Sequence, residues 1–222
     1  MRLFCALLTL VAPSAIFGQF MDIPSVTTLP PEPLTVGQKA LYHVDKVFNP
    51  LSLFQSGVQA GILQWNDDPR EWHQGSYGFW RRTVSTIGYD TARNTFMFAL
   101  NASLHQDPRY YPSEPGSKPR DRVSHAFKET FLGHTDGGKP VFAIIRFATT
   151  YGVAFLANGW NPDRLSDNRH AVVRGTVTLA ADAGNNIFFE FWPDIKKKYL
   201  HRKHTGADKE KPTKPASSYN KD

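Results

Sequence analysis

The sequence predicts an all-α fold, in which a compact bundle of about five to six helices lies between a disordered N-terminal linker and a basic C-terminal tail. Apolar residues recur at helical spacing in several segments, and proline, glycine or asparagine separates these segments from one another. The composition then changes within residues 184–198, GNNIFFEFWPDIKKK, where aromatic residues give way to lysines. We therefore expect the folded body to end near this stretch.

Composition and charge fit one globular domain with extensions at its ends. The 222 residues are 41% apolar and 21% charged. The net charge of +6 is uneven, because residues 1–195 carry 17 basic and 17 acidic side chains, whereas residues 196–222 carry 9 and 3. The excess positive charge belongs to the tail, so we expect no basic face on the body and no nucleic-acid partner.

Residues 1–18 have the features of a secretory signal peptide. Arg2 supplies the positive charge, an apolar run follows over residues 3–11, and cleavage is expected between residues 15 and 18. The apolar run is too short to span a bilayer. The single cysteine, Cys5, lies within it, so the mature chain would have no thiol for a disulfide, a nucleophile or a metal site. We expect export to the periplasm or cell envelope, with the outer membrane as one destination.

The helical domain is expected over residues 35–200. Before it, residues 19–34 contain four prolines and little apolar periodicity, which predicts a disordered linker. Thr35 is expected to cap a helix that ends at Phe48. The inner face of this helix would carry Ala40, Leu41, Val44 and Val47.

Two further helices are expected before residue 105. Asn49-Pro50 separates the first helix from a second over about residues 51–64, because proline suits the first turn of a helix. A long third helix is expected over about residues 77–104. The predicted inner faces are Leu53, Phe54, Val58 and Ile62 for the second helix, and Val84, Ile87, Phe96, Leu100 and Leu104 for the third.

The second half of the domain is predicted to hold three more helical segments. A short helix is expected over residues 120–132, and a glycine-rich turn follows at residues 135–138. The most apolar segment, residues 141–158, and a last helix over about residues 167–191 complete the bundle. Pro193 is expected to end the last helix. Residues 201–222 lack periodicity and are expected to form a disordered basic tail.

Two alternatives to a soluble bundle remain open. Residues 173–179 alternate between apolar and small or polar positions, and a small outer-membrane β-barrel would show this alternation over about ten residues per strand. Residues 141–158 do not alternate, which favours helices. Residues 141–160 are also long enough to cross a bilayer as a helix, but Arg146 and Asn158 would be costly near lipid.

Four stretches of the body carry a resemblance to known sequences. They are the HxDPRY pattern at residues 105–110, the EFWPDI pattern at residues 190–195, GSYGFWRR at residues 75–82 and DGG at residues 136–138. Through them the chain resembles a group of uncharacterised exported proteins of acidobacterial type. The resemblance implies an exported domain, and it brings no activity, cofactor or mechanism with it.

Four side chains are the candidates for chemistry: His105, Asp107, Arg109 and Glu190. His105 and Asp107 could act as an acid–base pair while Arg109 binds an anionic ligand, as in a small periplasmic hydrolase or ligand-binding domain. The structural interpretation is a corner in which Asp107 caps a turn and Arg109 pairs with a carboxylate. Glu190 either shares a cation or a proton with Asp194 or pairs with an arginine of the body.

Binding surfaces are predicted in two places. Lys196, Lys197, Lys198, Arg202 and Lys203 are expected to bind an anionic envelope surface or membrane. Three pairs of small residues four positions apart predict close helix packing or self-association: Gly57/Gly61, Ala148/Gly152 and Ala180/Gly184.

No metal or cofactor is expected, because the chain has no zinc-helix histidine pair and no phosphate-binding glycine motif. We therefore expect a non-enzymatic exported envelope protein that associates with a membrane or another surface. The hydrolase or ligand-binding domain centred on His105, Asp107 and Arg109 is the alternative.

Overall fold

The computed structural model of the chain describes residues 31–114 and 116–199, apart from the side chains of residues 196–199. These residues form six α-helices, three 3₁₀ helices and three short strands, which confirms the predicted all-α class. The predicted signal peptide, most of the linker and the tail over residues 201–222 lie outside the described residues. The chain divides into one unit that ends at Glu190 and a second that begins at Phe191, and each is described by itself.

The first two helices begin where the sequence predicts. Helix α2 (Val36–Phe48) starts with a capping box, in which the Thr35 hydroxyl accepts from the Gln38 amide and the Gln38 side chain accepts from the Thr35 amide. Asn49 ends α2 and caps helix α3 (Pro50–Trp65), since its side chain accepts from the Ser52 amide at 2.8 Å. One residue therefore ends the first helix and caps the second.

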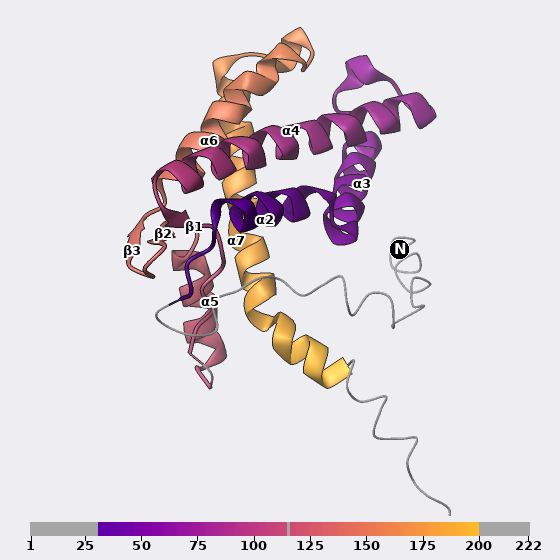
Figure 1. Cartoon of the computed structure of the whole chain (residues 1–222). Helices are drawn as coiled ribbons and strands as arrows, with labels where there is room; N and C mark the ends of the chain where they lie inside the picture. The colour runs from indigo at the N-terminus through magenta and orange to yellow at the C-terminus, as the bar shows by residue number, and fades with distance from the viewer. Residues whose placement is uncertain (1–30, 115, 200–222) are drawn as a thin grey trace, which may run out of the picture. The chain divides into compact units, whose positions relative to one another are not determined.

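Helix α4 (Gly75–Ser103) is the element against which the first half of the chain packs. The short 3₁₀ helix η1 (Arg70–Trp72) precedes it. Helices α2, α3 and α6 (Ile144–Leu156) all contact α4, and Figure 1 shows α2 alongside it with α3 crossing near one end. Two further 3₁₀ helices, η2 (Ala157–Gly159) and η3 (Asp163–Leu165), lead from α6 to the last helix.

A small antiparallel sheet replaces part of the predicted helical structure. Helix α5 (Pro119–Lys128) ends four residues earlier than predicted, and strand β2 (Leu132–Thr135) follows it. Strand β2 pairs with β3 (Pro140–Phe142), which lies within the segment predicted to be entirely helical, and with β1 (Gln106–Asp107). The physical reason is the glycine turn between β2 and β3. Gly138 has φ of 79°, which closes the hairpin and brings Leu132 opposite Phe142.

The last helix is longer than predicted. Helix α7 (Asn168–Tyr199) continues through Pro193, so the expectation that this proline ends the helix is wrong. Proline in a helix removes one backbone donor and strains the preceding turn, and a long helix accommodates this as a local defect when the turns on both sides persist. Helix α7 therefore runs from the first unit into the second.

Polar side chains occupy the interior of the first unit. Lys39 of α2 is only 2% exposed, and its ammonium group donates to Asp136 Oδ1 at 2.7 Å and to the Asn101 carbonyl at 3.3 Å. Leu41, two residues later, is 70% exposed. Further buried polar residues include His43, Arg82, Asp107, Glu129, Thr150, His134 and Glu190.

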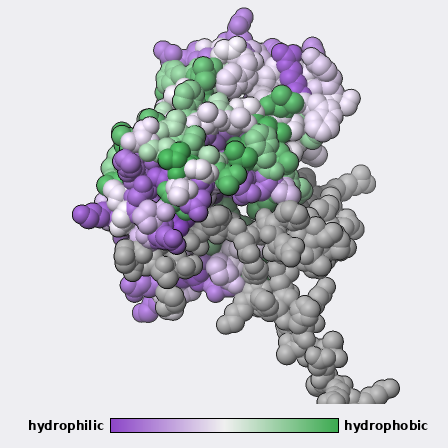
Figure 2. Space-filling model, in the orientation of Figure 1, coloured by the Kyte–Doolittle hydropathy of each residue, from purple (hydrophilic) through white to green (hydrophobic). Residues whose placement is uncertain are grey.

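The inner faces predicted for the first three helices are therefore largely wrong. Val47 is buried as predicted, but most other members of these faces are exposed: Leu41, Val44, Leu53, Phe54, Val58, Ile62, Val84, Phe96 and Leu104. The reason is that buried polar groups pair with one another, which leaves the apolar stripe of each helix on the outside. Figure 2 shows the result as green patches of apolar side chains on the visible surface. No helix within the described ranges is long and apolar enough to cross a membrane.

The predicted small-residue pairs do not mediate helix contacts within the described part of the chain. A Cβ placed at Gly57, Gly61, Gly152 or Gly184 would meet no atom within 4 Å. The close approach lies elsewhere, because a Cβ at Gly175 would lie 2.6 Å from Cδ1 of Tyr151. Gly175 is thus the glycine of α7 that lets a side chain of α6 pack directly on the backbone.

Alanine at two glycines of α7 is expected to have opposite effects. Gly175→Ala overpacks against Tyr151 and should lower the free energy of unfolding by about 1–2 kcal/mol. Gly184→Ala enters open space and should raise it by about 0.5–1 kcal/mol, through helix propensity alone. Urea unfolding of the two variants beside the wild type measures both changes. Equal effects of the two substitutions would contradict the packing of Tyr151 on Gly175.

Candidate functional site

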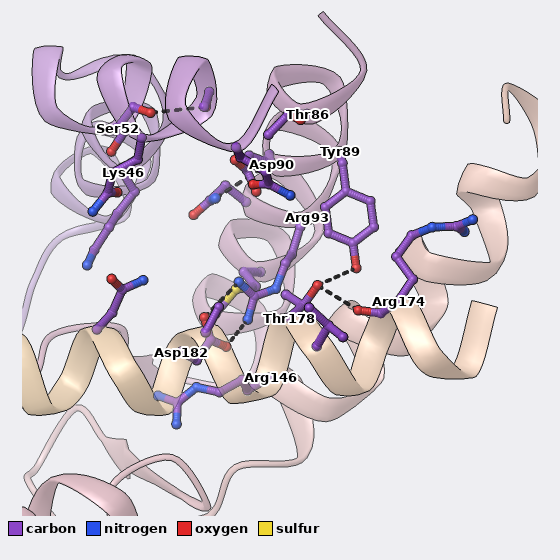
Figure 3. A pocket seen from close by; sticks show the side chains of 18 of the residues that line it. Lys46, Ser52, Thr86, Tyr89, Asp90, Arg93, Arg146, Arg174, Thr178 and Asp182 are labelled. Atoms are coloured by element: carbon purple, nitrogen blue, oxygen red, sulfur yellow. Dashed lines mark hydrogen bonds and ion pairs between the residues drawn. The ribbon is translucent and has the colours of Figure 1, made fainter. Parts of the chain in front are cut away.

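A polar cavity of about 710 Å³ lies inside the first unit. Helices α2, α3, α4, α6 and α7 all contribute side chains to its wall, and Figure 3 shows charged and hydroxyl groups from several of them pointing into the same space. Gln55 and Gln59 of α3 also line it and are exposed to solvent, so the cavity reaches the protein surface. This cavity is the candidate site, because it combines the size of a ligand pocket with several charged side chains in its wall.

An arginine–aspartate pair spans the cavity between α4 and α7. Arg93 donates through Nη1 to Asp182 Oδ1 at 3.2 Å and through Nη2 to Asp182 Oδ2, and its Nε donates to Thr150 Oγ1 at 2.9 Å. Burial alone would lower the pKa of Arg93, but the charge of Asp182 and its hydrogen bonds outweigh burial and raise that pKa. Arg93 is therefore a fixed cation held between three helices.

Asp90 lies one turn before Arg93, and its carboxylate has no hydrogen bond or ion pair within the described ranges of the chain. Burial raises the pKa of Asp90 to about 6, because the opposing effect of Arg93 is smaller and Asp182 adds to the rise. Next to it, Tyr89 donates to the Thr150 carbonyl at 3.2 Å and accepts from Thr178 at 3.3 Å. Asp90 is thus a carboxylate that faces the cavity with its hydrogen-bonding capacity unused.

Three more cations line the cavity without a carboxylate in contact. The Lys46 ammonium lies 5.5 Å from the centre of the Tyr42 ring and 5.1 Å from that of Phe189, with no hydrogen bond or ion pair to the described residues. Arg146 donates through Nη1 to the carbonyls of Glu129 and Thr130, both at 2.6 Å.

Arg174 completes this set from α7. It donates through Nη1 to the Ala154 carbonyl at 2.6 Å and through Nη2 to the Leu165 carbonyl at 3.1 Å. Burial lowers the pKa of both Arg146 and Arg174. Because their hydrogen bonds go to neutral carbonyls, the positive charges of these arginines are only weakly compensated.

A group of acids and histidines lies beside the cavity near the sheet. His125 is between two carboxylates, with Nε2 3.8 Å from Glu129 Oε1 and Nδ1 3.8 Å from Glu190 Oε2. His134 Nδ1 lies 3.7 Å from Glu129 Oε2, and its ring stacks on Tyr111 at 3.7 Å. Burial raises the pKa of Glu129 to about 7. Even so, no group of three or more metal-binding side chains forms within residues 31–114 and 116–199.

The predicted site residue Glu190 has a structural environment. Tyr110 donates to its Oε2 at 2.6 Å, the Ser113 amide donates to Oε1 at 3.2 Å, and Arg122 Nε lies 3.3 Å from Oε1. Burial acts to raise the pKa of Glu190, but these hydrogen bonds together outweigh it and lower that pKa. Glu190 therefore pairs with an arginine of the body, as one of the two sequence interpretations had it.

Asp107 and Arg109 pair with each other and both line the cavity, whereas His105 lies apart from them. The His105 side chain is 85% exposed, and its Nδ1 lies 3.9 Å from Asp136 Oδ2. Asp107 is buried and receives hydrogen bonds from Arg109 Nη2 at 2.6 Å and from the Tyr111 hydroxyl at 3.3 Å. The Asp107 carboxylate is thereby engaged in holding the corner around β1.

The predicted basic binding residues lie at the far end of α7 or beyond it. Lys196, Lys197 and Lys198 belong to the last turns of α7 as backbone positions, and Arg202 and Lys203 lie outside the described residues. The cavity residues were missed because their partners are distant in sequence. A signal was present nonetheless, since polar residues recur at helical spacing along two long helices: Arg82, Thr86, Asp90, Arg93 and Asn101 in α4, and Arg174, Thr178, Asp182 and Asn185 in α7.

Comparison with known proteins finds no match for this chain. The chain matches no protein-family model, no curated protein and no solved structure. The functional interpretation therefore rests on the geometry of the described residues and on the sequence.

Proposed function

We propose that the chain is a non-enzymatic, exported cell-envelope protein that attaches to an anionic membrane surface through the outer faces of α2 and α3. The observation that carries this proposal is the row of exposed apolar side chains on these two consecutive helices: Leu41, Val44, Phe48, Leu53, Phe54, Val58, Ile62 and Trp65. Soluble monomers rarely expose so many large apolar side chains on neighbouring turns.

The composition of the two helices suits the boundary between lipid headgroups and acyl chains. Helix α3 contains no charged residue along its sixteen positions. Helix α2 turns Lys39 and His43 inward, where both are buried, and Leu41, Val44 and Phe48 lie exposed beside Asp45, the one acidic residue of the helix. An amphipathic helix with this arrangement lies in the membrane plane with its apolar face in the interface. Attachment of this kind needs no membrane-spanning helix.

Electrostatic attraction supports the choice of an anionic surface. Residues 196–222 carry 9 basic and 3 acidic side chains, of which Lys196, Lys197, Lys198, Arg202 and Lys203 form the densest cluster. Each basic residue near an anionic leaflet contributes on the order of 1 kcal/mol. Export rests on residues 1–18, and it is the basis for placing this surface in the cell envelope.

Co-sedimentation with phosphatidylglycerol-containing vesicles tests the attachment. We expect the wild type to bind at low salt and to remain bound at about 1 M NaCl, where the Debye length is only about 3 Å. The Val44→Ser/Phe48→Ser/Phe54→Ser variant should bind about a hundredfold more weakly at high salt, since each apolar side chain buried in the interface contributes about 1 kcal/mol or more.

The matched control is Phe127→Ser, which removes an exposed apolar side chain from α5. It should leave vesicle binding unchanged. A wild type that stays in the supernatant with anionic vesicles, or a triple variant that binds as well as the wild type, would overturn the proposal. If the protein forms stable oligomers that the triple substitution dissociates while vesicles bind neither form, the apolar faces belong to self-association instead.

A further inference from the structure

We propose that the cavity binds a small polyhydroxylated organic anion, whose charged group lies beside Lys46. This inference does not depend on membrane attachment, because it concerns the interior of the first unit and the attachment concerns its outer face. It rests on two observations: cations in the cavity wall that have no carboxylate partner among the described residues, and neutral polar groups with free hydrogen-bonding capacity.

The cations of the cavity exceed the carboxylates that neutralise them. Six cationic side chains line the cavity against five carboxylates: Lys46, Arg82, Arg93, Arg109, Arg146 and Arg174 against Asp68, Asp90, Asp107, Glu129 and Asp182. Arg93 and Arg109 are in direct contact with Asp182 and Asp107. The half-buried Lys46 and Arg146 have no carboxylate of the described residues in contact, so neither has a direct counter-charge there.

Lys46 reaches from α2 toward α7. Its ammonium lies 5.1 Å from the centre of the Phe189 ring, and Figure 3 shows the side chain pointing toward α7. Arg93 is already neutralised by Asp182. An anion that enters the cavity next to Lys46 therefore meets a cation that has no carboxylate partner in the described part of the chain.

The surrounding wall offers hydrogen bonds to hydroxyl groups. Gln55, Gln59 and Asn185 line the cavity, and within the described part of the chain their side-chain amides make no hydrogen bond. A volume of about 710 Å³ exceeds what an inorganic ion needs and lies within the range of pockets for small organic ligands. A hydrophilic ligand that carries one anionic group and several hydroxyl groups fits both the charge and the amides.

Gluconate, glucose 6-phosphate and sorbitol are the probes for isothermal titration calorimetry with the full chain. Gluconate and sorbitol differ only in that a carboxylate replaces a hydroxymethyl group, so the pair isolates the requirement for charge. Glucose 6-phosphate distinguishes a phosphate from a carboxylate. We expect saturable binding of at least one of the two anions and none of sorbitol, in a buffer whose ionic strength is kept constant with NaCl.

Two substitutions should change anion binding in opposite directions. Lys46→Met removes a cation that makes no hydrogen bond or ion pair, and should weaken anion binding about tenfold or more. Asp90→Asn removes the negative charge that faces the same space, and should tighten anion binding severalfold. Lys139→Met replaces an exposed lysine and should leave binding unchanged.

Each result decides the inference. The inference would be overturned if both anions bound no more tightly than sorbitol. It would also be overturned if the Lys46→Met and Lys139→Met variants bound the anions with equal affinity. Circular dichroism and thermal melting first establish that the variants are folded. If the Lys46→Met variant does not fold, the Asp90→Asn variant still tests the inference. Vesicle binding measured on the same variants separates this inference from the proposed attachment, because none of the three substitutions alters the outer faces of α2 and α3.

Discussion

The Arg82→Met variant is expected to lose about 3–5 kcal/mol of unfolding free energy. Arg82 is completely buried, and it joins α4 to Gln64 of α3 and to the loop between the two helices. Its Nε donates to the Asp68 carbonyl at 2.9 Å, its Nη2 to the Pro69 carbonyl at 2.7 Å, and its Nη1 to the His73 carbonyl at 2.8 Å. Methionine fills a similar volume but has no donor, so these carbonyls would remain buried without partners.

The neighbouring arginine provides the matched control for this substitution. Arg81 is exposed, and its guanidinium carbon lies 5.2 Å from the centre of the Trp72 ring. Arg81→Met removes the same charge from the same helix and should cost less than about 1 kcal/mol. Urea titration followed by far-ultraviolet circular dichroism measures both variants. Similar losses for the two would show that Arg82 does not hold the connection between α3 and α4.

Glu190→Gln is expected to lower the free energy of unfolding by about 2–4 kcal/mol at neutral pH. The carboxylate receives hydrogen bonds from Tyr110 and from the backbone and side chain of Ser113, and it pairs with Arg122. It thereby fastens α7 to the segment between β1 and α5. Glutamine preserves the shape, but it loses the negative charge and can accept at only one of the two positions.

The pH dependence of this loss has a definite sign. Hydrogen bonds outweigh burial and hold the pKa of Glu190 below the ordinary value of 4.5, so the folded state binds this proton less readily than the unfolded state. The stabilisation is therefore present above about pH 4.5 and is lost as the pH falls through the folded-state pKa. The difference between wild type and Glu190→Gln should shrink in acid. Glu114→Gln, at an exposed position, should show no such trend, and a difference that stays constant down to acid pH would contradict the assignment.

Local signals were sufficient to predict most helix boundaries. Thr35 caps α2, Asn49 caps α3 and Pro50 occupies the first turn of α3, as their residue types indicate. These features depend on neighbours within four residues, which the sequence displays directly. Gly137 and Gly138 likewise marked the turn of the hairpin, although the strands on either side of it were too short to show alternation.

The direction in which each helix faces could not be predicted in the same way. Periodicity identifies the apolar stripe of a helix, but the inference that this stripe points inward assumes an apolar interior. Lys39 lies inside because Asp136, 97 residues away, neutralises it. A helix pattern contains no information about so distant a partner. The apolar stripe that includes Leu41 and Val44 was recognised correctly. Only the prediction that this stripe faces the interior was wrong.

The candidate site also depends on contacts between residues that are distant in sequence. An arginine partner for Glu190 was one of two interpretations of the sequence, but Arg122 is 68 residues away and could not be named. Asp90, Arg93 and Asp182 come together only when α4 and α7 pack, so no single segment indicates their contact. His105 and Asp107 are neighbours in sequence, yet the left-handed conformation of His105, with φ of 51°, separates their roles.

The polar interior also affects how the protein responds to temperature. Exposure of apolar groups on unfolding raises the heat capacity, whereas exposure of polar groups lowers it. Here Leu41, Phe54 and Ile62 already face outward in the folded chain, while Lys39, Arg82 and Glu190 are released from burial. The heat-capacity increment of unfolding should therefore fall below the usual value of about 12–15 cal/mol/K per residue. A smaller increment flattens the stability curve, so the free protein would lose stability only gradually on either side of its optimum temperature.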